Sequence, residues 1–235
     1  MTIKSKLLKF IEYPEASLGY FIGVSPNHLI TFLRIKGLIK NGLKTYIDVG
    51  ANKGDLIRTA KYFYPHIKIY AFDPIPNVFK FKDNINTKFF NIGLSDKKEK
   101  KTFYYNEGWD ACSTLHKPLK DHHSDFEPIE HFKKIKVHLD RFDNLNLEIK
   151  KPCFLKIDSE GHEFEVLKGF GDKLKEIDII QLEHCFRDYF SEEKNIGDTF
   201  NLLKKFGFGG IIQINSRYAA SGALTHCDFI FFRIK

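Results

Sequence analysis

Short apolar runs alternate with amphipathic segments along most of the chain, a pattern typical of a parallel β-sheet flanked by helices. The apolar runs predict strands over residues 44–50, 67–73, 88–94, 133–140, 153–158, 177–184, 209–215 and 227–234. The segments between them predict helices over residues 54–64, 74–83, 161–169 and 195–206. The last helix has Phe200, Leu203 and Phe206 at i, i+3 and i+6, so one of its faces is apolar.

The two final strands have no helical segment between them. The connection "SRYAASGALTHCD" (216–228) is short and rich in turn residues, so it cannot form a crossover helix. We therefore expect these strands to pair antiparallel. The sequence predicts an α/β fold whose mostly parallel sheet ends in an antiparallel hairpin, which differs from a plain dinucleotide-binding fold.

The length of 235 residues fits one α/β domain with a modest N-terminal addition. Residues 1–43 predict an N-terminal helical extension, with 27–42 as its best helix, and residues 44–235 form the main domain. We expect the extension to pack on the sheet; the alternative is a lid over the site. Residues 104–132 have little periodicity, and a loop of this length predicts a substrate or lid loop.

Composition and charge narrow the range of partners. The net charge is +7 and the pI is near 9.0. However, the lysines are spread along the chain, and their one cluster, at 95–101, also contains acidic residues. We therefore expect no nucleic-acid partner. No run is long and apolar enough for a membrane span, and the N-terminus lacks a signal peptide's apolar stretch, which predicts a cytoplasmic protein. The four cysteines are far apart, which argues against disulfides and structural zinc. A homo-oligomer is compatible with all of this.

The stretch "YIDVGANKGD" (46–55) runs from a predicted strand into a predicted helix. Gly50 and Gly54 allow a tight turn with a close backbone approach, and the helix-start amides would face a ligand outside the strand end. A turn without a ligand is the alternative. Asp73 ends the next strand, 19 residues after Gly54, where an acid is positioned to accept both ribose hydroxyls of an adenosine. Its alternative role is to cap the following helix.

Two further segments carry polar groups at predicted strand ends. "NIGLSD" (91–96) places Ser95 and Asp96 where an adenine edge would lie, although a turn or helix cap would use the same residues. "FLKIDSEGHEFEVLKGF" (154–170) places Asp158 and Glu160 beyond the strand that contains Lys156. This carboxylate pair predicts a catalytic or metal-orienting group; capping together with a Lys156 salt bridge is the alternative.

In this order and spacing, "YIDVGANKGD", "YAFDPIPNVF", "NIGLSD", "STL" (113–115) and "LKIDSEGHEFEVLKGF" resemble the FkbM family of S-adenosylmethionine-dependent methyltransferases. The resemblance extends from residue 44 to about residue 184. It implies a class I methyltransferase (Rossmann-like) fold, with a seven-stranded, mostly parallel sheet, an antiparallel last strand and helices on both faces. It also implies methyl transfer, usually to a hydroxyl of a sugar or a polyketide-type product.

The resemblance also assigns cofactor-binding positions. Asp48 to Gly54 would surround the methionine part of S-adenosylmethionine, Asp73 the ribose, and Ser95 and Asp96 the adenine. The full set of implied cofactor-binding residues is Asp48, Gly50, Ala51, Asn52, Gly54, Asp73, Pro74, Gly93, Leu94, Ser95, Asp96, Asp158 and Ser159. The chain departs from the family at Asp73, where Glu is common, and at Ser159, where a small apolar residue is usual.

Methylation of a hydroxyl requires that its proton be removed. The candidate catalytic residues are Asp158, Glu160 and His184, and Asp158, Glu183 and His184 are candidate ligands for Mg²⁺. Trp109, Ser113 and His116 in the long loop are candidate contacts to a glycan or small-molecule acceptor. A nicotinamide-dependent oxidoreductase and a non-catalytic cofactor-binding or assembly protein remain as alternatives.

Overall fold

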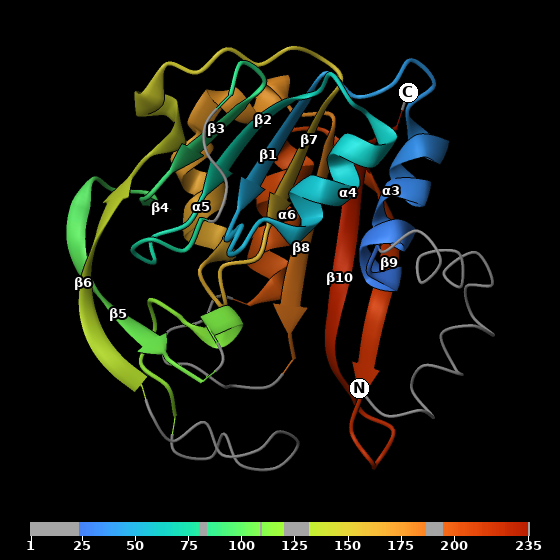
Figure 1. Cartoon of the computed structure of the whole chain (residues 1–235). Helices are drawn as coiled ribbons and strands as arrows, with labels where there is room; N and C mark the ends of the chain where they lie inside the picture. Colours follow the sequence, from blue (N-terminus) through green and yellow to red (C-terminus); the bar gives the residue numbers. More distant parts are fainter. Residues whose placement is uncertain (1–23, 80–83, 109, 120–131, 187–194, 235) are drawn as a thin grey trace.

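The computed structural model describes residues 24–79, 84–108, 110–119, 132–186 and 195–234. These residues form a seven-stranded sheet of order β3-β2-β1-β7-β8-β10-β9 (Figure 1). Its strands are β1 (Thr45–Val49), β2 (Lys68–Phe72), β3 (Thr87–Phe90), β7 (Cys153–Ile157), β8 (Ile179–Cys185), β9 (Phe208–Tyr218) and β10 (Leu224–Arg233). The first five run parallel, whereas β10 pairs antiparallel with both β8 and β9. The predicted class I methyltransferase fold and its antiparallel hairpin are confirmed.

Helices cover both faces of this sheet and make a three-layer structure (Figure 1). Helices α3 (Pro26–Leu38) and α4 (Asp55–Phe63) pack on one face, and α5 (Glu163–Phe170) and α6 (Ile196–Lys205) pack on the other. Three short 3₁₀ helices complete the set: η2 (Asp110–Cys112), η3 (Phe142–Leu145) and η4 (Gly171–Glu176). The segments predicted as helices at 54–64, 161–169 and 195–206 therefore form α4, α5 and α6.

The central strands are apolar because both of their faces are buried. Side chains alternate along a strand, so Tyr46 of β1 contacts the α3/α4 core while Ile47 and Val49 contact the α5/α6 core. A strand covered on both sides is an almost continuous apolar run rather than an alternating one. Asp48 interrupts this run, and it lies on the α3/α4 face at 1% exposure.

A second, three-stranded sheet of order β4-β6-β5 lies beside the main one (Figure 1). It contains β4 (Gly93–Leu94), β5 (Glu99–Asn106) and β6 (Phe132–Asp140). The predicted strand at 88–94 is thus two strands in two sheets, and 133–140 lies outside the main sheet. Strand β5 was not predicted, and the predicted loop 104–132 begins inside it. Its charged first residues and the burial of only Phe103 and Asn106 leave no apolar alternation to detect.

The predicted helix at 74–83 is wrong over its described part, residues 74–79, which form turns. The Ile75 N–H donates to the Asp73 carboxylate, and the Asn91 side-chain amide donates to the Ile75 carbonyl. Pro76 has no N–H to donate, and Asn77 is left-handed at φ 58°. The N–H and carbonyl of Ile75 are therefore bonded to side chains, and Pro76 and Asn77 cannot take part in helical hydrogen bonding and geometry at this point. Residues 80–83 lie outside the described part of the chain.

The N-terminal helix packs on the sheet, as expected for this element. Phe32 of α3 stacks on Phe63 of α4 with ring centroids 5.7 Å apart and meets Tyr46 edge-on at 6.1 Å. Residues 1–23 of the predicted extension lie outside the described residues. Among the helices that the structure describes, none combines the length and apolarity needed to span a membrane.

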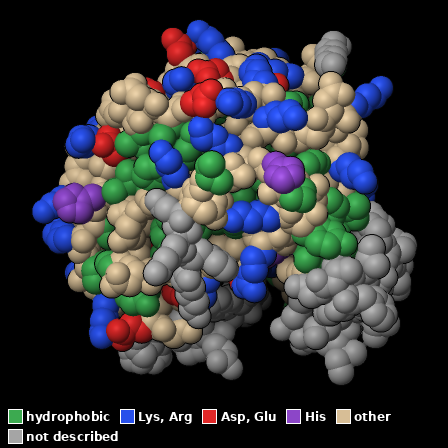
Figure 2. Space-filling view, turned by 45° about the horizontal axis from the view of Figure 1, so that its top comes forward, with side chains coloured by type: hydrophobic (Ala, Val, Ile, Leu, Met, Phe, Trp, Pro, Cys, Tyr) green, Lys and Arg blue, Asp and Glu red, His purple; other side chains and the backbone are tan. Residues whose placement is uncertain are grey.

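Charged side chains are mixed over the face shown in Figure 2. Lys and Arg side chains are scattered across it, with Asp and Glu among them. This distribution matches the even spacing of lysines along the sequence.

Two helical glycines give a matched test of the packing. A Cβ on Gly169 in α5 would lie 2.0 Å from the Ser95 carbonyl oxygen, whereas a Cβ on Gly37 in α3 would meet nothing within 4 Å. We expect Gly169→Ala to lower the free energy of unfolding by about 2 kcal/mol or more, because backbone must move. Gly37→Ala should raise it by about 0.5–1 kcal/mol through helix propensity. Urea unfolding measures both; equal effects would contradict this packing.

Candidate active site

The connection from β1 to α4 is a tight turn pressed between neighbouring strands. Gly50, Asn52 and Gly54 all have positive φ values, of 73°, 45° and 78°. The N–H groups of Gly50 and Ala51 both donate to the Phe72 carbonyl at the end of β2, at 3.0 Å. A Cβ on Gly50 would lie 1.8 Å from the Asp158 carbonyl oxygen. Only glycine therefore allows the ends of β1 and β7 to approach this closely.

A cavity of about 460 Å³ opens beside this turn, at the carboxyl ends of β1, β2 and β7. The cofactor-binding positions predicted from the sequence that line it are Asp48, Gly50, Ala51, Asn52, Asp73, Pro74, Gly93, Leu94, Asp158 and Ser159. The cavity thus brings together residues from four separate segments of the sequence. The crevice outside the carboxyl ends of parallel strands is where ligands bind in open α/β sheets.

Asp73 lies at the cavity wall, but its carboxylate already has partners. One oxygen accepts from the Asn52 N–H at 2.8 Å and the other from the Ile75 N–H at 2.9 Å. The side chain therefore caps the turn at Asn52 and Ile75 rather than a following helix, and it also faces the cavity, so the ribose role stays a prediction. Burial raises the pKa of Asp73 to about 6, and these two hydrogen bonds oppose that rise.

Gly54, Ser95 and Asp96 do not line the cavity. Gly54 is the N-cap residue of α4. The Ser95 hydroxyl lies 3.0 Å from Nε2 of His162, and the Asp96 carboxylate forms an ion pair with Lys168 at 2.6 Å. The segment 95–96 therefore packs against α5, which agrees with the turn interpretation of "NIGLSD".

Acidic side chains gather at the other end of the cavity. Carboxylate oxygens of Asp158, Glu160 and Glu183 all lie within 4.8 Å of one another. Asp158 and Glu160 line the cavity, and Glu183 comes from the neighbouring strand β8. Burial, followed by repulsion from the other acids, raises the pKa values of Glu160 and Glu183 well above the ordinary value for Glu. This acid cluster, Asp158, Glu160 and Glu183, is the main chemical feature of the site.

A buried lysine balances part of this negative charge. Lys156 on β7 pairs in register with Asp48 on β1, so both side chains point to the same face. Its ammonium lies 3.0 Å from Asp158 and 3.8 Å from Asp48. Burial alone would lower the pKa of Lys156, but Asp158 and Asp48 raise it above its ordinary value. Lys156 is therefore a fixed cation in the cavity wall.

Glu160 has an unusual backbone conformation, with φ of 50° in the left-handed region, followed by Gly161 at 93°. The Thr114 hydroxyl donates to the Glu160 carbonyl at 2.6 Å and holds this turn from the side of the second sheet. A left-handed non-glycine residue stores strain, and such residues cluster at functional sites. The strain therefore marks Glu160 among the three acids.

The structure does not bring His184 together with the acid cluster. His184 follows Glu183 along β8, and successive strand residues point to opposite faces. The His184 ring contacts Phe186 edge-on at a centroid distance of 4.9 Å, and burial lowers its pKa to about 4. Of the three candidate Mg²⁺ ligands, Asp158 and Glu183 share the cluster, and Glu160 takes the third place.

The candidate acceptor contacts lie at different depths. Ser113 lines the cavity and accepts a hydrogen bond from the Asn106 N–H at 3.0 Å. His116 is buried outside the cavity lining, against His162. Trp109 lies outside the described residues.

Sequence reasoning missed several residues that line the cavity: His28, Lys53, Asp55, Asp110 and His162. Lys53 and Asp110 form an ion pair at 2.7 Å, which joins the β1 turn to η2. His28 comes from α3, and burial lowers its pKa to about 4. Lys53, Asp55 and His162 lie inside motifs that the sequence analysis quotes, whereas His28 and Asp110 reach the cavity only through contacts between segments far apart in the sequence.

The sequence model of the methyltransferase FkbM domain matches residues 48–209, which is more than half of the chain. The chain therefore belongs to the FkbM family of S-adenosylmethionine-dependent methyltransferases. The matched region contains the glycine turn, Asp73 and the acid cluster. This family membership does not support the nicotinamide-dependent alternative. A comparison with curated proteins finds no match.

Solved methyltransferase structures resemble this one at low identity. A human methyltransferase 10 domain containing protein is 10% identical with a TM-score of 0.45, covering 89% of this chain and 82% of its own. Precorrin-6y C5,15-methyltransferase from Geobacter metallireducens is 11% identical with a TM-score of 0.42, covering 82% and 81%. Human N-acetylserotonin methyltransferase is 13% identical with a TM-score of 0.38, covering 82% and 48%. At these scores the likeness carries no argument about the acceptor.

The acid Glu163, at the start of α5, gives a pH test of the site's electrostatics. Its Oε1 accepts from both the N–H and the hydroxyl of Ser159, at 2.8 and 3.0 Å, yet burial raises its pKa from 4.5 to about 7. The folded state favours the protonated form, so the free energy of unfolding falls as pH rises through this window.

We expect Glu163→Gln to remove this fall, because glutamine keeps the accepting oxygen and cannot ionise. The variant should gain stability over the wild type from pH 4.5 to about 7, at about 1.4 kcal/mol per unit of pKa shift. Urea unfolding below and above this window measures the difference. Glu99→Gln, at an exposed position, is the control. A difference that does not change with pH would contradict the burial of this charge.

Proposed function

We propose that this methyltransferase binds S-adenosylmethionine beside the β1 turn and methylates a hydroxyl of a sugar, a glycan or a related small molecule. Two features of the cavity support the proposal. Beside the β1 turn, Gly50 lets a ligand approach the backbone closely, and Asp48 and Asp73 supply acids that suit an adenosyl and amino-acid ligand. The other end has a group of acids that suits the removal of a hydroxyl proton.

Asp48 supports the cofactor end of the proposal. Its side chain lines the cavity at 1% exposure, and neither carboxylate oxygen has a hydrogen-bond partner among the described residues. The Lys156 ammonium lies 3.8 Å away and balances its charge, but a buried carboxylate without hydrogen bonds is costly, so its position beside a cavity suggests a ligand that donates them. The ammonium of the methionine part would be such a donor, and Asp73 would accept from the ribose hydroxyls with its remaining lone pairs.

The acid cluster supports the acceptor end. The cofactor supplies an activated methyl group, so the protein must orient the acceptor and take up its proton. A carboxylate with a raised pKa is a stronger proton acceptor than an ordinary one. Burial raises the pKa of Glu160 from an ordinary Glu value, and Glu160 faces the cavity. We assign Glu160 as the base, with Asp158 orienting the acceptor hydroxyl.

The same acids also support an acceptor that is rich in hydroxyls. Carboxylate oxygens accept hydrogen bonds from neighbouring hydroxyls, which a sugar offers in pairs. Phe103 adds an apolar surface to the cavity wall, and Ser113 adds a small polar group. A polyhydroxylated acceptor would use all of these groups together, and this combination carries the glycan part of the proposal.

The acid cluster also meets one requirement of a Mg²⁺ site, because three carboxylate oxygens converge within 4.8 Å. However, the Lys156 ammonium lies 3.0 Å from Asp158 and already supplies a cation at this point. We therefore favour a metal-independent base. Activity that is lost with a chelator and restored by Mg²⁺ would instead favour Asp158, Glu160 and Glu183 as metal ligands.

Cofactor binding has a direct test at the β1 turn. We expect Gly50→Ala to abolish detectable binding of S-adenosylmethionine, because its Cβ would lie 1.8 Å from the Asp158 carbonyl oxygen. Asp73→Asn should weaken binding by about tenfold or more, because a carboxylate acceptor is lost. Isothermal titration with S-adenosylmethionine and its demethylated product measures both. Wild-type affinity in both variants would place the cofactor elsewhere.

The base assignment has a kinetic test. We expect Glu160→Gln to lower kcat by about 10²-fold or more, with cofactor affinity nearly unchanged. Asp158→Asn should lower kcat and also raise the acceptor KM, because it positions the hydroxyl. The exposed Glu99→Gln is the matched control. A Glu160→Gln enzyme with full turnover would rule out this base.

The acceptor class can be tested with the radiolabelled methyl donor. A panel of free sugars, nucleotide sugars, amines and nucleic acids would be offered to the purified protein, and mass spectrometry would locate the methyl group. A methyl ether on a sugar supports the proposal, whereas transfer only to nitrogen contradicts it. Cofactor binding without transfer to any acceptor would favour the non-catalytic alternative.

A further inference from the structure

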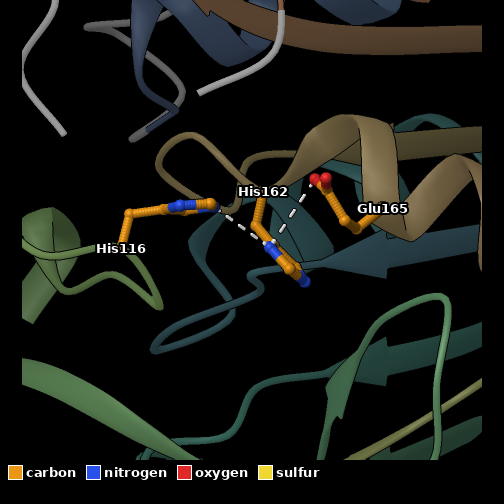
Figure 3. Close-up of side chains that lie close together, drawn as sticks. All are labelled: His116, His162 and Glu165. Atoms are coloured by element: carbon orange, nitrogen blue, oxygen red, sulfur yellow. Dashed lines mark hydrogen bonds and ion pairs between the residues drawn. The ribbon is translucent and has the colours of Figure 1, made fainter. Parts of the chain in front are cut away.

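Two histidines and a glutamate converge next to the loop that carries Glu160, and one of them, His162, also lines the cavity. Figure 3 shows the side chains of His116, His162 and Glu165 pointing toward one another. Nε2 of His116 lies 3.2 Å from Nδ1 of His162, and that nitrogen lies 3.7 Å from Oε2 of Glu165. All three ligand atoms lie within 4.8 Å of one another. We call these residues the histidine cluster.

We propose that the histidine cluster binds a first-row divalent transition metal, with Zn²⁺ as the best fit. Zn²⁺ takes histidine nitrogens at about 2.0–2.1 Å and carboxylate oxygens at about 2.0–2.2 Å in tetrahedral geometry. Neighbouring ligand atoms in such a site are about 3.3–3.5 Å apart. The spacings of 3.2 and 3.7 Å bracket that range, and the third pair, His116 and Glu165, lies within 4.8 Å and would have to close on the metal.

The ligand types identify the class of metal. Two imidazoles with one carboxylate suit Zn²⁺, Cu²⁺, Ni²⁺ and Fe²⁺, whereas Mg²⁺ and Ca²⁺ prefer oxygen ligands alone. The all-carboxylate acid cluster is therefore a different kind of site. Three protein ligands would leave the fourth tetrahedral position for a water molecule.

The second nitrogen of His162 has the partner that a metal-bound imidazole requires. Its Nε2 lies 3.0 Å from the hydroxyl oxygen of Ser95, which is 2% exposed. With the proton on Nε2 donated to this oxygen, Nδ1 presents its lone pair to His116 and Glu165. Burial lowers the pKa of His162 to about 3, so the ring is neutral at physiological pH.

The backbone holds both ligand-bearing segments in place. The His116 N–H donates to the Thr114 hydroxyl oxygen at 3.1 Å, and that hydroxyl donates to the Glu160 carbonyl at 2.6 Å. His162 is the N-cap residue of α5, and Glu165 lies three residues later, in the first turn. A bound metal would therefore tie the segment around His116 to α5, directly behind Glu160.

A metal-free explanation also exists, because a hydrogen bond between the two histidine rings would account for the 3.2 Å distance. Metal titration separates the two explanations. Full-length protein stripped with a chelator would be titrated with Zn²⁺ by calorimetry, and with Co²⁺ by visible absorption. We expect one Zn²⁺ per chain and the intense visible bands of four- or five-coordinate Co²⁺. No binding, or only the weak bands of octahedral Co²⁺, would overturn the proposal.

Variants then locate the metal. Glu165→Gln and His116→Asn should each lower the Zn²⁺ affinity by at least tenfold, and Ser95→Ala by about 10- to 100-fold through its support of His162. His66→Ala removes an exposed histidine and should leave the affinity unchanged. Glu183→Gln should also leave it unchanged. Loss of binding in Glu183→Gln but not in Glu165→Gln would move the metal to the acid cluster and overturn the assignment. Circular dichroism confirms folding of each variant, and the isosteric Glu165→Gln decides if His116→Asn does not fold.

Discussion

The contact between the ends of β1 and β7 determines the geometry of the whole site. The Asp158 N–H donates to the Val49 carbonyl at 3.0 Å. The Asp158 carbonyl oxygen lies so close to Gly50 that a Cβ on this residue would be only 1.8 Å from it. One backbone contact thus joins the glycine turn to the loop that carries the acids. The glycine turn and the acids Asp158 and Glu160 consequently line one cavity side by side, as the proposed in-line transfer would require.

A row of charged groups crosses the centre of a sheet that is otherwise apolar. Asp48, Lys156 and Asp158 lie on the α3/α4 face, where a core of aliphatic side chains would be the more stable choice. Removing Lys156 would leave the carboxylate of Asp48, at 1% exposure, without an opposite charge. Residues that break the local rules of packing mark functional sites in otherwise consistent folds. All three residues line the cavity, which suggests that the fold keeps these charges for a role in the site despite their cost in stability.

The sheet could be predicted from the sequence because its central strands are covered on both sides and give long apolar runs. Strand β5 and the turn at 74–79 could not, since their structure depends on contacts with distant residues such as Asn91 and on the prolines. Most of the predicted cofactor-binding residues line the cavity, because strand ends and glycines can be recognised in the sequence. The three acids were all named from the sequence, but His184 was wrongly grouped with them. Neighbouring residues on a strand point to opposite faces, and this rule applied to β8 would have separated His184 from Glu183. His28 leaves no local signal, and although His116 was a candidate and His162 and Glu165 stand in one motif, their convergence joins segments 46 residues apart and could not be read from the sequence.

The loop 158–162 connects the two kinds of chemistry that this site offers. Asp158 and Glu160 line the cavity, and His162 at the end of the loop lines it too while its ring nitrogens approach Ser95 and His116. The left-handed conformation of Glu160 is stable only because both sides of the loop are held, by Thr114 at its carbonyl and by Ser95 at His162. Glu160, the proposed base, is therefore held by contacts next to the second sheet, through Thr114 and Ser95. This explains why the fold adds the sheet β4-β6-β5 at this edge: it supports the loop from the side that the main sheet cannot reach.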